Sequence, residues 1–343
     1  MIELPPLPAQ PATTPWPTGS WPSADLPAAV DAAALHGLVR TLIDLPPEHG
    51  VTDAVLVVHR GALVLEAYGP EANAQRTLQS WSMAKSMLHA LVGVLVLDGR
   101  IDPEARLPAP EWQADGDPRA RISWRDALRM RSGLAFAEDY ANAGASDVIE
   151  MLWGAGKDDV ARYAADKPLE HAIGSVFNYS SGTTNILSRA IGELIGGGEA
   201  GMRAFMTERL FSPLGMLSPL PKFDSRGTWK GSSFCFCTAQ DFARFALLYL
   251  RDGLWDGERL LPPGWADDAR TPTHLEPDAA YGSHWWVDHR DPTRFFASGY
   301  EGQRILIDPA RDLIAMRFGR TPNERAPEVM EPLHAIPALF TRA

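Results

Sequence analysis

The sequence has only two cysteines, Cys235 and Cys237, among its 343 residues. Residues at positions i and i+2 of a strand share one face, where two cysteines are poorly placed for a disulfide. A zinc site would need further ligands, and the nine histidines show neither H-x-H nor H-E-x-x-H spacing. We therefore expect two small buried thiols in a reducing compartment, and neither a metal nor another cofactor.

Positive charge and long apolar runs are also scarce. The formal net charge is −11 and no segment is rich in lysine or arginine, which argues against nucleic acid and anionic membranes as partners. No apolar run approaches the roughly 18 residues that span a bilayer, and residues 1–8 lack the features of a secretory signal. We expect a cytoplasmic protein that acts on a small molecule, and we leave open whether it forms a homodimer.

Two common catalytic motifs are absent. The sequence contains no G-x-S-x-G, the nucleophile elbow of α/β-hydrolases, and no G-x-x-x-x-G-K-[ST] phosphate loop. Residues 196–201 match G-x-G-x-x-G, but they follow a predicted helix rather than a strand, so they indicate a loop and not a dinucleotide site. Any catalysis must therefore depend on other residues.

What is present is one lysine in an unusual place. The chain has five lysines and 27 arginines, and Lys85 lies three residues after Ser82, just before the nearly all-apolar stretch 87–97. A helix that is apolar on all sides is buried, and burial favours the neutral amine of lysine, a form that arginine does not reach. Residues i and i+3 share a helix face, so Ser82 and Lys85 can act as nucleophile and base. The alternative is a serine cap followed by a surface lysine.

Two further segments complete a candidate site. Tyr179 lies in a short polar turn between a strand-like run, Ser175–Asn178, and a predicted helix, where it could carry protons; the alternative is a tyrosine that packs at the helix start. Residues 295–303 contain Ser298, Gly299 and Tyr300, and predict a strand edge whose backbone N–H groups could bind an oxyanion. A simple hairpin turn would give the same pattern, and both interpretations can hold together.

The order of predicted elements is strands, then helices, then strands. We expect a helix over 24–44, a hairpin of strands 51–59 and 62–68, a helix that ends at Asp98-Gly99, and a helical region to about residue 250. Strands at 283–288, 294–298, 304–308 and 313–318 and a helix over 326–341 follow. This order predicts an α+β fold with an antiparallel sheet built from both chain ends, flanked by helices, and an inserted, mainly helical subdomain.

The domain organisation follows from the same pattern. We expect a proline-rich extended arm over residues 1–22, whose Trp16 and Trp21 dock on the body. A sheet subdomain would comprise residues 23–80 and 270–343, and a mainly helical subdomain residues 81–269. The candidate site would lie in the cleft between the two subdomains.

Taken in order, the Ser82–Lys85 pair, the turn with Tyr179 and the segment 295–303 resemble the motifs of the penicillin-recognising serine hydrolases. The matching branch of that family contains the class C β-lactamases and the D-alanyl-D-alanine peptidases. Within that branch the chain is most similar to bacterial 6-aminohexanoate-dimer hydrolases and related esterases, from Trp16 to the last helix. The stretches that carry the resemblance are Trp81–Ser86, Ser132–Leu134, Glu138–Tyr140, Asn178–Asn185, Gly231–Phe234 and Gly302-Gln303. The resemblance implies a β-lactamase/transpeptidase-like fold and a cofactor-independent serine hydrolase.

The resemblance also implies residue roles. Ser82 would be acylated, Lys85 would be its base, and Tyr179 would transfer protons to the leaving group and from water. The backbone N–H groups of Ser82 and Tyr300 would form the oxyanion hole, and Tyr140 would close over the substrate amide.

The last of these three segments, residues 295–303, departs from the pattern of the lactamases. Ala297-Ser298-Gly299 has no basic residue to bind a substrate carboxylate, and Ser181 stands where lactamases usually have asparagine. We therefore expect small linear amides or carboxylic esters as substrates. The alternatives are β-lactamase or D-aminopeptidase or DD-peptidase activity, and a non-catalytic ligand-binding module on the same scaffold.

Four tryptophans could wall an aromatic cleft or fill the core: Trp112, Trp153, Trp285 and Trp286.

Overall fold

The computed structural model describes residues 3–140, 146–277 and 279–342, and a large antiparallel sheet lies at its centre. Its eight strands follow the order β2-β1-β13-β12-β11-β10-β9-β8. Because β1 pairs with both β2 and β13, the sheet joins the two ends of the chain, as the sequence predicts. The strand bounds are β1 (Val51–His59), β2 (Ala62–Tyr68), β8 (His274–Leu275), β9 (Ala280–Tyr281), β10 (Trp286–Val287), β11 (Phe295–Gly299), β12 (Gln303–Asp308) and β13 (Leu313–Arg320).

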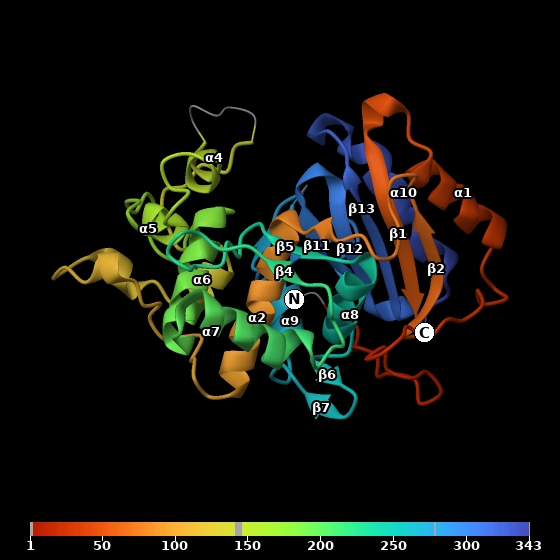
Figure 1. Ribbon diagram of the computed structural model, residues 1–343, viewed down its shortest axis with the longest axis horizontal. Coiled ribbons are helices and arrows are strands. Elements are labelled where there is room, and N and C mark those ends of the chain that lie inside the picture. Colours follow the sequence, from red (N-terminus) through yellow and green to blue (C-terminus); the bar gives the residue numbers. More distant parts are fainter. Residues whose placement is uncertain (1–2, 141–145, 278, 343) are drawn as a thin grey trace.

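Helices cover both faces of this sheet, so its central strands are buried on both sides. Along β1, Val55 and Val57 pack into a cluster with α1 (Ala32–Ile43) and α10 (Ala326–Ala335). The alternating residues Leu56 and Val58 belong to the other cluster, which includes α2 (Ala84–Leu97) and α8 (Ala239–Leu250). Figure 1 shows α1 and α10 beside β1 and β13, with α2 between the sheet and the helical region. The continuous apolar run of β1 is the pattern expected of such a strand.

The helical region follows α2 and contains most of the remaining elements. Its helices are α3 (Trp124–Leu128), α4 (Asp147–Leu152), α5 (Val160–Ala165), α6 (Ser181–Ile195), α7 (Gly198–Met206), continued by a π-turn at Thr207–Phe211, and α9 (Trp265–Arg270). Small sheets are formed by β3 (Leu78–Gln79), β5 (Cys235–Cys237) and β4 (Leu220–Pro221), and by β6 (Leu254–Trp255) and β7 (Glu258–Arg259). Within the described ranges, every helix is too short or too polar to traverse a bilayer.

Several predicted bounds were wrong. The first helix begins only at Ala32, because Asp31 caps it by accepting a hydrogen bond from the Ala34 amide. The run Ser175–Asn178 is not a strand, since the amide of Asn178 bonds the carbonyl of Met130 instead of a neighbouring strand. The predicted strand 283–288 shortens to β10 because the backbone of His284 is left-handed (φ 53°).

The last helix also ends earlier than predicted. The α-helix stops at Ala335 and continues as a 3-10 turn over Ile336–Leu339, where Pro337 supplies no N–H. The two-residue strands β8 and β9 and the short helix α9 were not predicted. The division of the chain into an arm and two subdomains stays a prediction.

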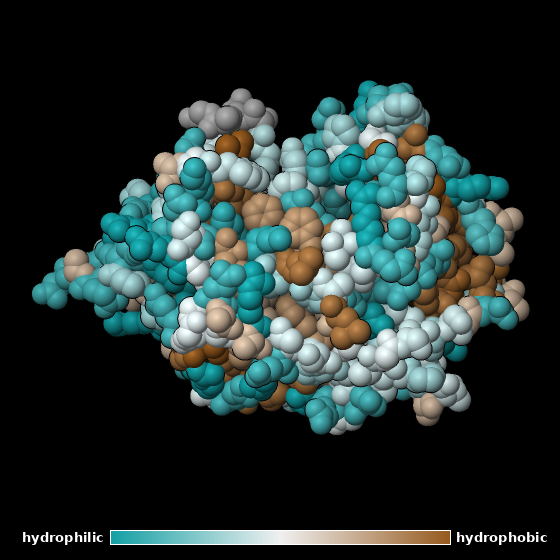
Figure 2. Space-filling model, in the orientation of Figure 1, coloured by the Kyte–Doolittle hydropathy of each residue, from teal (hydrophilic) through white to brown (hydrophobic). Residues whose placement is uncertain are grey.

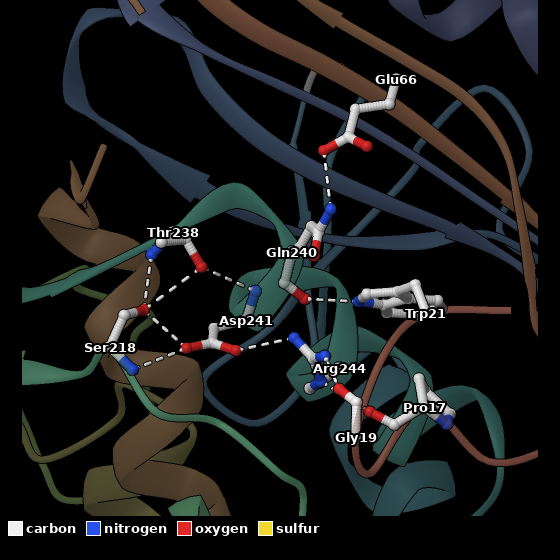
Figure 3. Close-up of polar contacts among 9 residues, drawn as sticks. All are labelled: Pro17, Gly19, Trp21, Glu66, Ser218, Thr238, Gln240, Asp241 and Arg244. Atoms are coloured by element: carbon white, nitrogen blue, oxygen red, sulfur yellow. Dashed lines mark hydrogen bonds and ion pairs between the residues drawn. The ribbon is translucent and has the colours of Figure 1, made fainter. Parts of the chain in front are cut away.

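The proline-rich arm packs on the body, as its tryptophans predict. The indole of Trp21 donates to the carbonyl of Gln240 (3.1 Å), at the start of α8. One turn further, Arg244 donates to the carbonyls of Pro17 (2.7 Å) and Gly19 (2.6 Å) and to the carboxylate of Asp241 (2.8 Å) (Figure 3). The arm is thus held on α8 by hydrogen bonds in both directions, from Trp21 to the helix and from Arg244 to the arm.

Candidate active site

Lys85 is buried beside Ser82 where the chain turns into α2. Ser82 lies in a 3-10 turn, Trp81–Met83, that leads directly into the helix. The amine Nζ of Lys85 lies 2.9 Å from Ser82 Oγ, 3.0 Å from Ser181 Oγ and 3.0 Å from the carbonyl oxygen of Ser232. These contacts use the full hydrogen-bonding capacity of a side chain that is only 1% exposed. The i, i+3 spacing therefore brings the two groups together as the sequence predicts.

Burial lowers the pKa of Lys85 to about 8, although the negative charge of Glu138 opposes this shift. Desolvation acts on lysine in this direction because it penalises the ammonium form. At pH 7, roughly a tenth of the molecules then carry a neutral amine at this position. A neutral amine within hydrogen-bond distance of a serine hydroxyl can accept its proton.

Tyr179 lies next to Lys85, two residues before the first residue of α6. The Nζ atom of Lys85 is 4.8 Å from the centre of the Tyr179 ring. The ring also packs against Trp286 (5.1 Å between ring centres) and Tyr281 (5.9 Å). Burial raises the pKa of Tyr179, whereas hydrogen bonds with Ser82 and Trp286 lower it. The phenol is therefore a proton donor at neutral pH that already contacts the Ser82 hydroxyl.

Glu138 is part of the site, although no local sequence pattern predicts a role for it. Its carboxylate accepts hydrogen bonds from the amide of Ser181 (2.8 Å), from the Ser181 hydroxyl (2.6 Å) and from the Tyr140 hydroxyl (2.7 Å). Ser181, whose hydroxyl also accepts from Lys85, thus connects the lysine to the carboxylate. Glu138 lies in a loop without periodic pattern, 43 residues before Ser181, and the only signal for it was its place in the resembling stretch Glu138–Tyr140.

The third predicted segment forms the strand edge beside Ser82. On β11, strand β10 pairs with Phe295 and Phe296 alone, so among the described residues the later half of β11 has a ladder partner on one side only, β12. A Cβ atom at Gly299 would lie 2.5 Å from the carbonyl oxygen of Ser80, so glycine lets the two segments touch. Ser82 is in the first turn of a helical segment, where amides lack intrahelical acceptors. The amides of Ser82 and Tyr300 are thus carried by two segments in contact.

Trp81 and Glu301 link these two segments directly. Both have left-handed backbones, with φ of 45° and 62°, which costs of order 1–3 kcal/mol for residues other than glycine. The indole of Trp81 donates to the Glu301 carboxylate at 3.1 Å. Each residue is next to one of the two amides, because Trp81 precedes Ser82 and Glu301 follows Tyr300. The hydrogen bond holds both strained turns in one arrangement.

Aromatic side chains surround the site. Tyr140 stacks on Tyr300 at 4.8 Å between ring centres, and Trp81 meets Tyr300 edge to face at 5.5 Å. Trp153 is 48% exposed and packs edge to face with Trp81 and Phe234. Figure 2 shows a notch between the two lobes of the molecule, with hydrophobic residues gathered at its floor.

The four tryptophans named from the sequence divide into two pairs. Trp112 and Trp285 are fully buried in the core, whereas Trp153 and Trp286 belong to the site. Cys235 and Cys237 are free and buried, with their sulfur atoms 3.8 Å apart.

Comparison with known proteins gives a consistent result. The Beta-lactamase family model matches residues 35–336. The 6-aminohexanoate-dimer hydrolase of Paenarthrobacter ureafaciens is 24% identical over 311 residues, which are 84% of this chain and 78% of that protein.

Solved structures share the fold. A Bacillus anthracis protein described as a candidate 6-aminohexanoate-dimer hydrolase superposes with a TM-score of 0.76 at 22% identity, covering 93% of this chain and 87% of that one. A family VIII carboxylesterase gives a TM-score of 0.65 at 13% identity, with coverage of 91% and 98%. At such identities these structures establish the fold alone. The family match covers most of the chain, so the chain belongs to the beta-lactamase family and is a serine hydrolase of that fold.

Proposed function

We propose that the protein hydrolyses small linear amides or carboxylic esters through an acyl-enzyme formed on Ser82. The observation that carries this proposal is the 2.9 Å contact between the buried Lys85 amine and the Ser82 hydroxyl. The same chain is similar to a 6-aminohexanoate-dimer hydrolase in sequence and to a carboxylesterase in fold. Those two activities cleave an amide and an ester, which share one acyl-transfer chemistry.

Acylation begins with proton transfer. Neutral Lys85 takes the proton of Ser82 while Oγ forms a bond to the substrate carbonyl carbon, and the carbonyl electron pair moves onto oxygen. The amides of Ser82 and Tyr300 donate to this oxyanion, and such donors are typically worth 10²–10³-fold in rate. As the carbonyl re-forms, the bond to the leaving nitrogen or oxygen breaks, and Tyr179 protonates that atom. Lys85 then returns a proton to Tyr179.

Deacylation reverses these roles. Water attacks the acyl carbon while Tyr179 accepts the water proton and passes its own phenolic proton to the neutral Lys85. The bond between Ser82 Oγ and the acyl carbon then breaks, and the Ser82 oxygen takes this proton from the lysine. The product is a free carboxylic acid and the enzyme is unchanged. The Ser82 hydroxyl already contacts both Lys85 and Tyr179, and no cofactor is needed for this scheme.

The residues near the site favour neutral or cationic substrates around the scissile bond. Ala297 supplies no charge, and its side chain is buried in the core. Glu138 adds a negative charge one hydroxyl group away from Lys85, which repels a nearby carboxylate. β-Lactam and D-alanyl peptide substrates carry such a carboxylate, so both features support esters or linear amides over these alternatives. We also propose that Tyr140, stacked on Tyr300, contacts the substrate amide.

The proposal is tested by steady-state hydrolysis of p-nitrophenyl butyrate, the linear 6-aminohexanoate dimer and nitrocefin, with Ser82→Ala as the control. We expect turnover of the ester or the linear amide, lost in Ser82→Ala, and little turnover of nitrocefin. Nitrocefin as the preferred substrate would move the assignment to β-lactamase activity. Absence of turnover for all three with folded protein would favour a non-catalytic binding module.

The two free, buried thiols of Cys235 and Cys237 suit a reducing compartment. On this basis we propose that the enzyme acts in the cytoplasm, which fractionation of the producing cell would test. Light scattering would show whether the protein forms a homodimer.

A further inference from the structure

A second cavity lies between α10 and the outer face of strands β10–β12, apart from the residues described above. It encloses about 340 Å³ and is lined by Phe296 and Arg304 of the sheet and by Met330 and His334 of α10, among others. The strand register pairs Ser298 with Arg304, so Arg304 lies near the end of β12 that is next to the site. Figure 1 places α10 on the sheet face opposite α2.

Arg304 is only part-buried, and it has fewer partners within the protein than three fully buried arginines. Arg317 donates to five oxygen atoms of the protein, and Arg244 and Arg251 each donate to three, one of them a carboxylate oxygen. In the described residues, Arg304 has no hydrogen bond or ion pair, and its Nε atom is buried without a partner. Buried donors are nearly always paired in native proteins, so the buried Nε–H of Arg304 marks a place for an acceptor in the cavity.

The guanidinium is nevertheless held in a fixed position. Its central carbon lies 3.9 Å from the centre of the Phe296 ring, and Phe296 is itself stacked parallel to Trp286 at 6.5 Å. Stacking on an aromatic face leaves the edge of the guanidinium, with its N–H groups, free to meet a planar anion. Burial lowers the pKa of Arg304 to about 10, so the group is still positively charged at neutral pH.

His334 adds a second unpartnered polar atom to the cavity. Its Nδ1 atom lies 3.4 Å from the carboxylate of Asp288, while Nε2 is buried with no hydrogen-bond partner among the described residues. Arg294 also pairs with Asp288, at 3.2 Å, so the negative charge of Asp288 is already shared by two neighbours. Asp288 also attracts Arg304 at longer range, and Glu331 lines the same cavity, but in the described residues neither carboxylate forms an ion pair with Arg304.

We propose that this cavity binds a small organic carboxylate. The carboxylate would pair with the edge of Arg304, and an aliphatic body of a few carbon atoms would lie along Met330 and the Phe296 ring. Two parallel N–H···O bonds to a carboxylate are the contact for which arginine geometry is best suited. The His334 Nε2 atom would accept a hydrogen bond from a hydroxyl or amino group of the same molecule. This inference does not depend on the hydrolase activity of Ser82.

The test is isothermal titration calorimetry with hexanoate, hexanol and inorganic phosphate at pH 7. We expect hexanoate to bind the wild type, and Arg304→Gln to weaken this binding at least about tenfold, the effect of losing a charge-assisted pair. The matched control is Arg325→Gln, because Arg325 is an exposed arginine next to α10 that does not line the cavity. Its affinity for hexanoate should equal that of the wild type.

Three results would overturn the proposal. Equal affinity for hexanol would mean that no charge is recognised, and preferred binding of phosphate would indicate an inorganic anion site. Unchanged hexanoate binding in Arg304→Gln would place the ligand elsewhere. If Arg304→Gln does not fold, Met330→Glu serves instead: it puts a negative charge on the half-buried cavity wall and should abolish hexanoate binding, and retained binding would contradict the assignment.

Discussion

The amine of Lys85 and the carboxylate of Glu138 are bridged by a single hydroxyl group, that of Ser181. Lys85 donates to Ser181 Oγ at 3.0 Å, and Ser181 donates to Glu138 at 2.6 Å. The base is thus connected to a carboxylate by two hydrogen bonds through Ser181 rather than by a direct ion pair. It can also transmit a change at Glu138 to the protonation of Lys85, because the carboxylate stabilises the ammonium form.

This relationship predicts the pH dependence of activity. Lys85 must be neutral to accept the Ser82 proton, and its pKa is about 8, so kcat/KM should rise as the pH increases through about 8 and fall below it. Glu138 raises the pKa of Lys85, so Glu138→Gln should move this limb to lower pH. The pH profile of ester hydrolysis measures both. Glu170→Gln, at an exposed position, should leave the limb in place, and an upward or absent shift in Glu138→Gln would contradict the account.

Gly299 should not tolerate a side chain. A Cβ atom there would lie 2.5 Å from the Ser80 carbonyl, so Gly299→Ala should push β11 away from the Ser82 turn. We expect kcat/KM to fall by about 100-fold, the typical cost of an ångström-scale displacement, with about 1–3 kcal/mol lost from the free energy of unfolding.

The matched control for Gly299→Ala is Gly192→Ala in α6, where a Cβ would meet no atom within 4 Å. It should leave activity unchanged and stabilise the protein by about 0.5–1 kcal/mol, because alanine is the better helix former. Urea unfolding and ester hydrolysis of both variants provide the comparison. Equal activities in the two alanine variants would show that contact between β11 and the Ser82 turn is unimportant.

The hydrogen bond between Trp81 and Glu301 should matter for catalysis. Trp81→Phe keeps an aromatic ring but removes the indole N–H, which leaves two left-handed turns without their link. We expect a loss in kcat/KM of about tenfold, measured as ester hydrolysis. Trp153→Phe removes an indole from the same aromatic group, and it should retain most of its activity. Similar losses in both variants would assign the effect to ring size rather than to the bond.

The N-terminal arm should contribute to stability more than to chemistry. Arg244→Gln removes the donors to Pro17 and Gly19 and leaves Asp241 buried without its partner. Breaking such a buried pair typically costs about 3–5 kcal/mol, which urea unfolding would report, while the folded fraction should keep its kcat. The control is Arg203→Gln, because the Arg203 side chain is 43% exposed in its ion pair with Glu199. This variant should lose less than about 1 kcal/mol from the free energy of unfolding.

Whether a feature of the fold or the site could be predicted depended on how far apart its residues lie along the chain. The hairpin of β1 and β2 and the pairing of Ser82 with Lys85 are local, so strand composition and helix spacing were sufficient to predict them. Tyr179 was found from its turn, although the strand expected before it is absent.

Features that need two distant segments were not predictable from local pattern. Glu138 meets Ser181 across 43 residues, and Trp81 meets Glu301 across 220, with no periodicity to mark either pair. The two-residue strands β8 and β9 fall below the length at which alternation can be recognised. The strained backbone of Trp81 is likewise fixed by tertiary contacts, since tryptophan has no preference for a left-handed turn.

The most direct test of the central claim is intact-mass spectrometry after incubation with a fluorophosphonate, which reacts with activated serines. We predict one adduct on the wild type, none on Ser82→Ala, and labelling at least about 100-fold slower for Lys85→Ala, because a positioned base contributes on the order of 10²–10⁴-fold. An adduct that persists in Ser82→Ala, or a folded wild type that takes up no label, would contradict the assignment of Ser82 as the nucleophile.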